Sequence, residues 1–127
     1  MTQKFSKDQR LRSTDEFRRC YDGGVRSGDD HLLVFVLRND TKTSRLGVSV
    51  SRKHGNAVAR NRKKRLLREA FRLSQQKLPQ GVDFVVVPRQ RSDSTLTDYQ
   101  SSLQRLARKL AKRLPTPKKD RGAEQPS

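Results

Sequence analysis

The chain of 127 residues is 31% hydrophobic and 6% aromatic, which is enough for one small two-layer domain of roughly 100 residues and excludes a second core. Thirty Lys and Arg residues against thirteen Asp and Glu residues give a formal net charge of +17, which indicates a polyanionic partner, with nucleic acid favoured over an anionic membrane. The single cysteine excludes an intramolecular disulfide. Because no run is apolar enough for a signal peptide or a membrane-spanning helix, we expect a cytoplasmic protein with no membrane partner.

The N-terminal part of the chain is predicted to be an arm followed by a short helix. Residues 1–12 are polar and basic and should form the arm. A helix should begin after Ser13, because Glu16 three residues later completes a capping box, and Gly23 and Gly24 should end it. Its spacing places three residues on one face: Phe17, Cys20 and Tyr21.

Two strands are predicted next, joined by a turn at 39–42. The first, 31–37, is apolar on both faces and should be central in a sheet. The second, 45–51, alternates, with larger apolar residues on one side: Leu46, Val48 and Val50. Its other side carries only small residues: Gly47, Ser49 and Ser51. A further short strand could lie between residues 24 and 31, but no pattern supports it.

A long helix is predicted over 57–76, where the positive charge concentrates. Nine basic residues and one acidic residue lie between Arg52 and Arg72. At about 100° per residue, one arc of this helix is apolar. The opposite arc forms a basic ridge: Arg60, Asn61, Lys64, Arg65, Arg68 and Arg72. Lys63 falls on the apolar arc, so either its stem extends along that face toward solvent or the face is less buried than the pattern indicates.

Three interpretations of this ridge compete. A merely solvated face would normally include acidic residues at i+4, and only Glu69 is available. A membrane-surface helix would need a larger apolar face with aromatic anchors, for which Phe71 alone is poor support. A phosphate-binding helix fits best, because the arginine guanidinium makes bidentate contacts with phosphate.

The C-terminal part is predicted to contain a buried strand over 82–87 and a last helix whose capping box is Thr97 with Gln100. That helix should bury one stripe: Leu96, Tyr99, Leu103, Leu106, Leu110 and Leu114. From residue 115 onward the chain is rich in Pro and Lys and is expected to be disordered. The elements together predict an α+β sandwich of helices over a small sheet.

A second surface is suggested by the small-residue side of the strand 45–51. If the first helix packs against the sheet edge, Phe17, Tyr21 and Phe35 would line a shallow groove. Arg52 and Lys53 would bound that groove, and stacked aromatics beside a basic wall are typical of single-stranded nucleic-acid binding. The alternative, that the three aromatics are ordinary core residues, is equally open.

We expect no catalytic residue and no metal site on the protein itself. The two histidines, His31 and His54, have no carboxylates around them at metal-ligand spacing. The sequence contains neither a nucleophile elbow nor the spacing of a P-loop. His54 lies in a basic stretch and is expected to contact phosphate or solvent.

The segment from Gly47 to Phe71, which contains Arg60-Asn61-Arg62, closely resembles the signature of the bacterial ribonuclease P protein family. The resemblance extends from about Arg10 to Leu114. It implies a small mixed sheet with a left-handed crossover, in which the Arg-Asn-Arg helix connects two parallel strands. It also implies a protein that binds a large catalytic RNA, while Mg²⁺ held by that RNA hydrolyses precursor tRNA and removes its 5′ leader.

The resemblance further implies which residues bind. The basic helix and the neighbouring loop would contact the catalytic RNA: Arg52, Arg60, Asn61, Arg62, Lys64, Arg65, Arg68 and Arg72. A central cleft would receive the leader: Phe17, Tyr21, Phe35, Ser49, Ser51 and Lys53. The chain would then consist of a basic arm (1–12), an RNA-binding domain (13–114) and a basic tail (115–127), acting as a monomer in a 1:1 complex with the RNA. Lys63 replaces the aliphatic residue usual in the motif.

Two other classes of function are left open by the residues alone. A structural protein of the ribosomal or chromatin type could use the same basic helix without assisting any reaction. A self-sufficient nuclease is the third class, and it would cleave RNA without an RNA partner.

Overall fold

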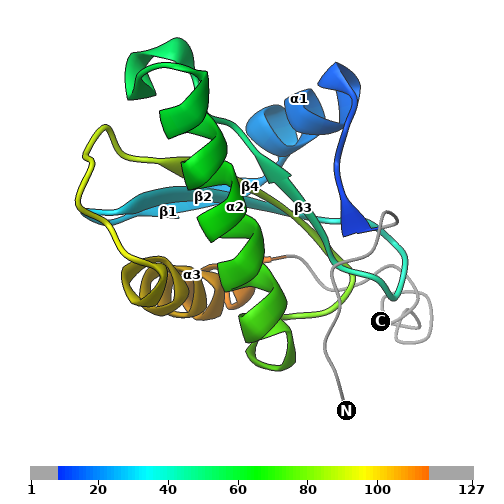
Figure 1. Ribbon diagram of the computed structural model, residues 1–127. Helices are drawn as coiled ribbons and strands as arrows, with labels where there is room; N and C mark the ends of the chain where they lie inside the picture. Colours follow the sequence, from blue (N-terminus) through cyan, green and yellow to red (C-terminus); the bar gives the residue numbers. More distant parts are fainter. Residues whose placement is uncertain (1–8, 115–127) are drawn as a thin grey trace, which may run out of the picture.

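The computed structural model describes residues 9–114, which form three α-helices and one four-stranded sheet (Figure 1). The elements in chain order are α1 (Thr14–Gly23), β1 (Val25–Gly28), β2 (Leu32–Arg38), β3 (Arg45–Val48), α2 (Ala57–Ser74), β4 (Val82–Pro88) and α3 (Leu96–Ala111). Two short 3-10 turns, η2 (Arg52–His54) and η3 (Gln75–Lys77), flank α2. Most of the predicted arm and all of the predicted tail lie outside the described residues.

The sheet is mixed, with strand order β1-β2-β4-β3. β2 pairs antiparallel with β1 and β4, whereas β3 pairs parallel with β4. α2 connects these two parallel strands across the front of the sheet in Figure 1, and the crossover is left-handed. Nearly all such crossovers in proteins are right-handed, so this connection is a distinctive mark of the fold. The predicted α+β sandwich with a left-handed crossover through the basic helix is confirmed.

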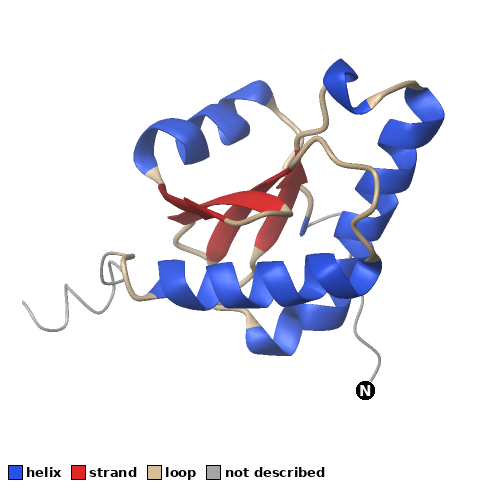
Figure 2. Ribbon diagram, turned by 90° about the vertical axis from the view of Figure 1, so that its left-hand side faces the viewer, coloured by secondary structure: helices blue, strands red, loops and turns tan. Residues whose placement is uncertain are grey.

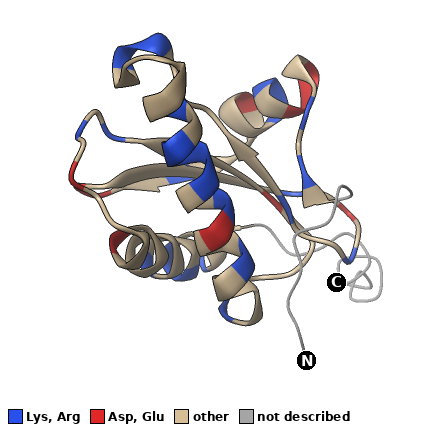
Figure 3. Cartoon of the chain, in the orientation of Figure 1, with Lys and Arg blue, Asp and Glu red and all other residues tan. Residues whose placement is uncertain are grey.

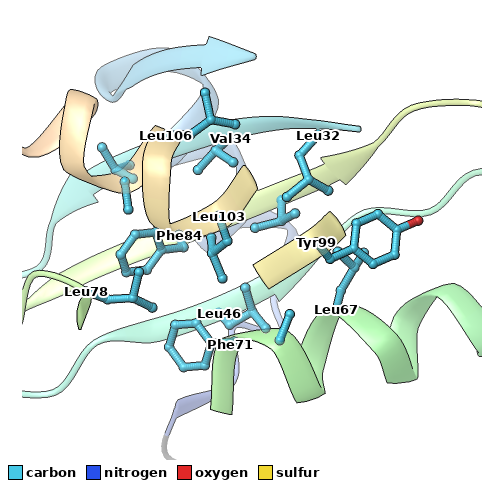
Figure 4. Close-up of a cluster of buried hydrophobic side chains, with 14 of the residues drawn as sticks. Leu32, Val34, Leu46, Leu67, Phe71, Leu78, Phe84, Tyr99, Leu103 and Leu106 are labelled. Carbon is cyan, nitrogen blue, oxygen red and sulfur yellow. The ribbon is translucent and has the colours of Figure 1, made fainter. Parts of the chain in front are cut away.

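Helices cover both faces of the sheet (Figure 2). α2 and α3 pack on one face over the main core, which includes Phe71, Phe84 and Tyr99 (Figure 4). α1 lies on the other face over a smaller cluster that includes Cys20, Phe35 and Val85. Because β2 and β4 are covered on both sides, they are apolar at nearly every position, as the sequence predicted for central strands.

The ends of the helices test the predicted caps. At α1 the Ser13 hydroxyl accepts from the backbone N–H of Glu16 (3.1 Å), and the Glu16 carboxylate accepts from the N–H of Ser13 (3.1 Å), so this capping box is confirmed. At α3 the prediction is wrong by two residues. Thr95 and Asp98 form the box there, because Asp98 at the third helical position accepts from the N–H of Thr95 (2.9 Å) as a glutamate would.

One strand prediction needs correction, and one strand that was left open is present. β3 ends at Val48, three residues before the predicted end, although the N–H of Ser49 still donates to the carbonyl of Val86 (3.0 Å). β1 is present over Val25–Gly28, within the range where a further strand was considered possible without a supporting pattern. No helix within residues 9–114 is long and apolar enough to cross a membrane.

Candidate nucleic-acid interface

α2 supplies the basic surface of the molecule, with Lys and Arg recurring along its length (Figure 3). Asn56 caps its first turn by accepting from the N–H of Ala59 (2.9 Å). The predicted apolar arc is confirmed at Leu67, Ala70 and Phe71, which are buried against the sheet and α3. This anchoring fixes the rotation of the helix, so Arg62 and Arg65 are exposed on the side away from the core.

The predicted RNA-contacting residues fall into two groups by exposure. Four are exposed: Arg52, Asn61, Arg62 and Arg65. Four are half-buried at the sides of the helix: Arg60, Lys64, Arg68 and Arg72. The predicted placement of Arg60 on the outer arc is wrong, because it lies seven residues before Leu67 and therefore on the same side of α2. Its Nε is buried and has no hydrogen-bond partner among residues 9–114.

A hollow of about 650 Å³ opens along the outer side of α2. Its charged lining is almost entirely positive: Arg10, Arg62, Arg65, Arg68, Glu69 and Arg72. The one acid is already engaged, since Glu69 Oε1 accepts from Arg72 Nε (2.9 Å). Burial, followed by the charge of Arg10, lowers the pKa of Arg68. Repulsion among these guanidinium groups would be relieved by an anion in the hollow.

The three aromatic residues of the predicted groove do lie together. The rings of Tyr21 and Phe35 meet edge to face with centroids 4.9 Å apart, and Phe17 lies 6.5 Å from Tyr21. Phe35 is 7% exposed and belongs to the core, whereas Tyr21 is 41% exposed and presents its ring to solvent. Phe35 therefore follows the core alternative and Tyr21 is the accessible ring, while a groove that binds a single strand stays a prediction.

The small-residue side of β3 is less open than the sequence pattern predicted. Gly47 is buried beneath Phe17, because a Cβ atom at this position would lie only 2.6 Å from Phe17 Cζ. Ser49 is half-buried and Ser51 is exposed, and the Ser51 hydroxyl accepts from the N–H of Lys53 (3.4 Å) at the start of η2. Lys53 is exposed and lines a separate hollow beside α2.

An ion-pair network that sequence reasoning missed holds α1 on the sheet. Arg45 donates to both carboxylate oxygens of Asp83 (2.8 and 2.7 Å) and to Glu16 Oε2 (3.0 Å). Asp83 is 3% exposed, and its hydrogen bond is the main cause that raises the pKa of Arg45. The only signal in the sequence is one carboxylate inside the apolar run 82–87, and nothing local indicates its partners.

Lys63, which the sequence placed on the apolar arc, is half-buried and reaches two polar partners. Its ammonium donates to Nδ1 of His54 (2.7 Å) and to the carbonyl of Arg89 (3.2 Å). The stem thus extends along the helix side to a polar end, as one of the two alternatives predicted.

Groups suited to catalysis or metal binding are sparse in residues 9–114. No cluster of three or more His, Cys, Asp or Glu residues in this range could hold a metal ion. Cys20 is fully buried, and burial followed by the charge of Asp83 raises the pKa of its thiol to about 12, so the thiol is neutral.

Comparisons with known proteins agree with this geometry. The family model described as Ribonuclease P matches residues 5–113. The chain is 42% identical over 111 residues to the ribonuclease P protein component of Desulfovibrio desulfuricans, covering 84% of this chain and 85% of that protein. It is 36% identical over 107 residues to that of Clostridioides difficile, covering 83% and 94%.

Solved structures give the same result. The RNase P protein of Staphylococcus aureus superposes with a TM-score of 0.70 at 35% identity, covering 82% of this chain and 95% of that one. The RNase P protein from Thermotoga maritima superposes with a TM-score of 0.72 at 31% identity, covering 79% and 96%.

Proposed function

The chain belongs to the bacterial ribonuclease P protein family, and from this we propose that it binds the ribonuclease P RNA through α2 and the 5′ leader of precursor tRNA through the groove beside α1. Membership makes the chain an RNA-binding subunit of ribonuclease P, which takes part in the 5′ processing of tRNA, with the ribonuclease P RNA as its partner. One observation carries the proposed division: α2 and the aromatic cluster lie on opposite faces of the sheet. One domain can therefore hold two RNA strands at once.

The basic ridge suits a folded RNA. Arg65 of the ridge and the neighbouring Arg62 are exposed on α2, and their planar donors suit contacts to phosphates. Such contacts release counterions, so the affinity should fall steeply with salt. The phosphate backbone can satisfy the positive hollow without any base being read.

The aromatic groove suits a single strand. Tyr21 is exposed, and its edge-to-face contact with Phe35 fixes the orientation of its ring, so a base can stack on the free face. Each such stack contributes about 1–3 kcal/mol and depends little on sequence. A leader of variable sequence, unpaired and adjacent to the tRNA body, has the properties that this surface accepts.

We assign hydrolysis to the RNA partner, with Mg²⁺ bound to that RNA. The protein's contribution is positive charge, since the guanidinium groups around the hollow can neutralise phosphates that Mg²⁺ would otherwise have to screen. This supports a lower Mg²⁺ requirement for the complex than for the RNA alone. One protein per RNA is sufficient, because a single copy carries both surfaces.

The decisive experiment is reconstitution with a bacterial ribonuclease P RNA and an assay of precursor-tRNA cleavage at low Mg²⁺. We expect the full chain to stimulate cleavage and to favour precursor over mature tRNA. A variant with Arg62→Ala and Arg65→Ala should lose stimulation, while Arg108→Ala with Lys109→Ala, on the exposed side of α3, should retain it. Absence of stimulation, or cleavage by the protein without RNA, would refute the proposal.

A further inference from the structure

A second hollow, of about 660 Å³, lies beside α2. Three segments form it: the turn η2, the N-terminal half of α2, and the loop from β4 to α3, drawn in yellow in Figure 1. Its titratable lining is Lys53, His54, Arg62, Lys63, Arg91 and Asp93. Lys53 belongs to the predicted leader cleft and Arg62 to the predicted RNA-contacting set, whereas neither set includes His54, Lys63, Arg91 or Asp93.

The protonation of His54 follows from its partner. The Lys63 ammonium has donors only, so at 2.7 Å it must donate to Nδ1 of His54. His54 is then neutral, with its proton on Nε2, and that N–H is left as a donor. Lys63 also donates to the carbonyl of Arg89 (3.2 Å), so its ammonium is held at the wall of the hollow.

The hollow contains more positive than negative charge. η2 contributes Lys53, α2 contributes Arg62 and Lys63, and the loop contributes Arg91 and Asp93. Asp93 pairs with Arg91, with Nε–Oδ1 2.7 Å and Nη2–Oδ2 3.1 Å, so the only carboxylate of this lining is engaged. Three cations from two elements remain for an anion.

We propose that this hollow is a subsite for one phosphate of the RNA backbone, bound by the Nε2–H of His54 and the ammonium of Lys63, with Lys53 and Arg62 beside it. The proposal rests on the chain's binding of ribonuclease P RNA and adds a third contact to the ridge and the groove. The contrasting interpretation is a purely structural latch, in which Lys63 only ties η2 and the loop to α2. A latch needs no anion and predicts no change in salt dependence.

Binding of a phosphate should be linked to protonation of His54. Burial, followed by the charge of Lys63, lowers the pKa of His54 in the free protein. A phosphate favours the imidazolium and raises this pKa. The added proton goes to Nδ1, so the Lys63 ammonium leaves that atom and turns to the phosphate, and protons are taken up on binding. The affinity for RNA should therefore increase as the pH falls through the range in which the bound His54 titrates.

The test compares the full-length wild type with Lys63→Met and His54→Gln in binding to a bacterial ribonuclease P RNA. Lys63→Met retains the stem and removes the charge, and it should reduce the slope of log affinity against log salt by about 0.7–0.9. His54→Gln should remove the acid-dependent gain in affinity that the wild type shows. Lys109→Met, at an exposed position on α3, is the charge-matched control and should change the slope by less.

Folding of each variant is measured by thermal unfolding. Binding of an anion in the hollow is measured separately, by NMR titration of the His54 ring with inorganic pyrophosphate. Pyrophosphate should raise the pKa of His54 in the wild type and should have a smaller effect in Lys63→Met. A wild-type slope in Lys63→Met, or no pyrophosphate effect on His54, would overturn the subsite and leave a latch. Either result with intact wild-type binding leaves the proposed function standing, whereas a wild type that neither binds nor stimulates the RNA would refute that function.

Discussion

Replacing Gly47 by alanine adds one methyl group at the point where α1 approaches the sheet. The new Cβ would lie 2.6 Å from Cζ and 3.0 Å from Cε2 of Phe17, and 3.1 Å from Cβ of Leu11. Carbon atoms pack at about 3.5–4.0 Å, so the Phe17 ring must retreat by about 1 Å. Gly47 does not have a positive φ, so the cost arises from space alone.

Overpacking of this kind typically costs about 1–3 kcal/mol. The loss of chain freedom in the unfolded state offsets about 0.4–1 kcal/mol of that cost. We therefore expect Gly47→Ala to lower the free energy of unfolding by about 1–2 kcal/mol. Because Phe17 and Tyr21 share a face of α1, the same shift should weaken binding of precursor tRNA. Affinity for the ribonuclease P RNA should be unchanged, since α2 lies on the other face of the sheet.

The assay is a double-mutant cycle with Phe17→Ala, measured by denaturant unfolding. Once the ring is removed, only the Leu11 contact at 3.1 Å remains, so Gly47→Ala should cost much less and the two substitutions should couple by about 1–3 kcal/mol. Binding of precursor and mature tRNA to the reconstituted complex gives the second readout. If Gly47→Ala cost the same with and without the Phe17 ring, the close approach of α1 would not be what requires glycine.

Three further predictions follow from named contacts. Two backbone N–H groups, followed by the charge of a neighbouring arginine, lower the pKa of Glu16. Its stabilising contribution is therefore present above the unfolded pKa and is lost as the pH falls through the folded pKa. The free energy of unfolding of Glu16→Gln, measured across acidic pH, should fall less steeply with decreasing pH than that of the wild type. Thr95→Ala should destabilise the protein by about 1 kcal/mol in thermal unfolding, whereas Thr97→Ala should have little effect. Arg65→Ala should reduce the slope of log affinity for ribonuclease P RNA against log salt by about 0.7–0.9 and leave the preference for precursor over mature tRNA unchanged. Tyr21→Ala should leave that slope unchanged and weaken leader binding by about 1–3 kcal/mol.

Local patterns predicted most of the fold because each was enforced by burial or by a cap. The alternation around Gly47 reflects a strand with the core on one side and α1 on the other, and the Ser13 box fixes where α1 begins. β1 could be named only as a possible strand, because a four-residue strand at the sheet edge has no periodicity to detect. Thr95 was missed because Thr97 offered a competing pair with glutamine in place of the aspartate that the cap uses.

The candidate site was predicted less completely, since several of its features depend on contacts between distant residues. Arg45 and Asp83 are 38 residues apart, and no local pattern shows that they meet. Arg60 was assigned to the outer arc by its charge, although its seven-residue spacing from Leu67 places it on the same side of α2 as that core residue. The aromatic cluster was predicted because helical spacing places Phe17 and Tyr21 on one face of α1. Only the fold could assign Phe35 to the core and Tyr21 to the surface.

The crowding of like charge on α2 has a thermodynamic consequence for the free subunit. One side of the helix secures the core through Leu67 and Phe71, while the other concentrates arginines whose mutual repulsion opposes the folded state. RNA binds the native chain and removes that repulsion, so it should raise the melting temperature. The difference between free and bound subunits should shrink as salt increases, because counterions then perform part of the same screening. Heat resistance in this protein is therefore partly a property of its complex.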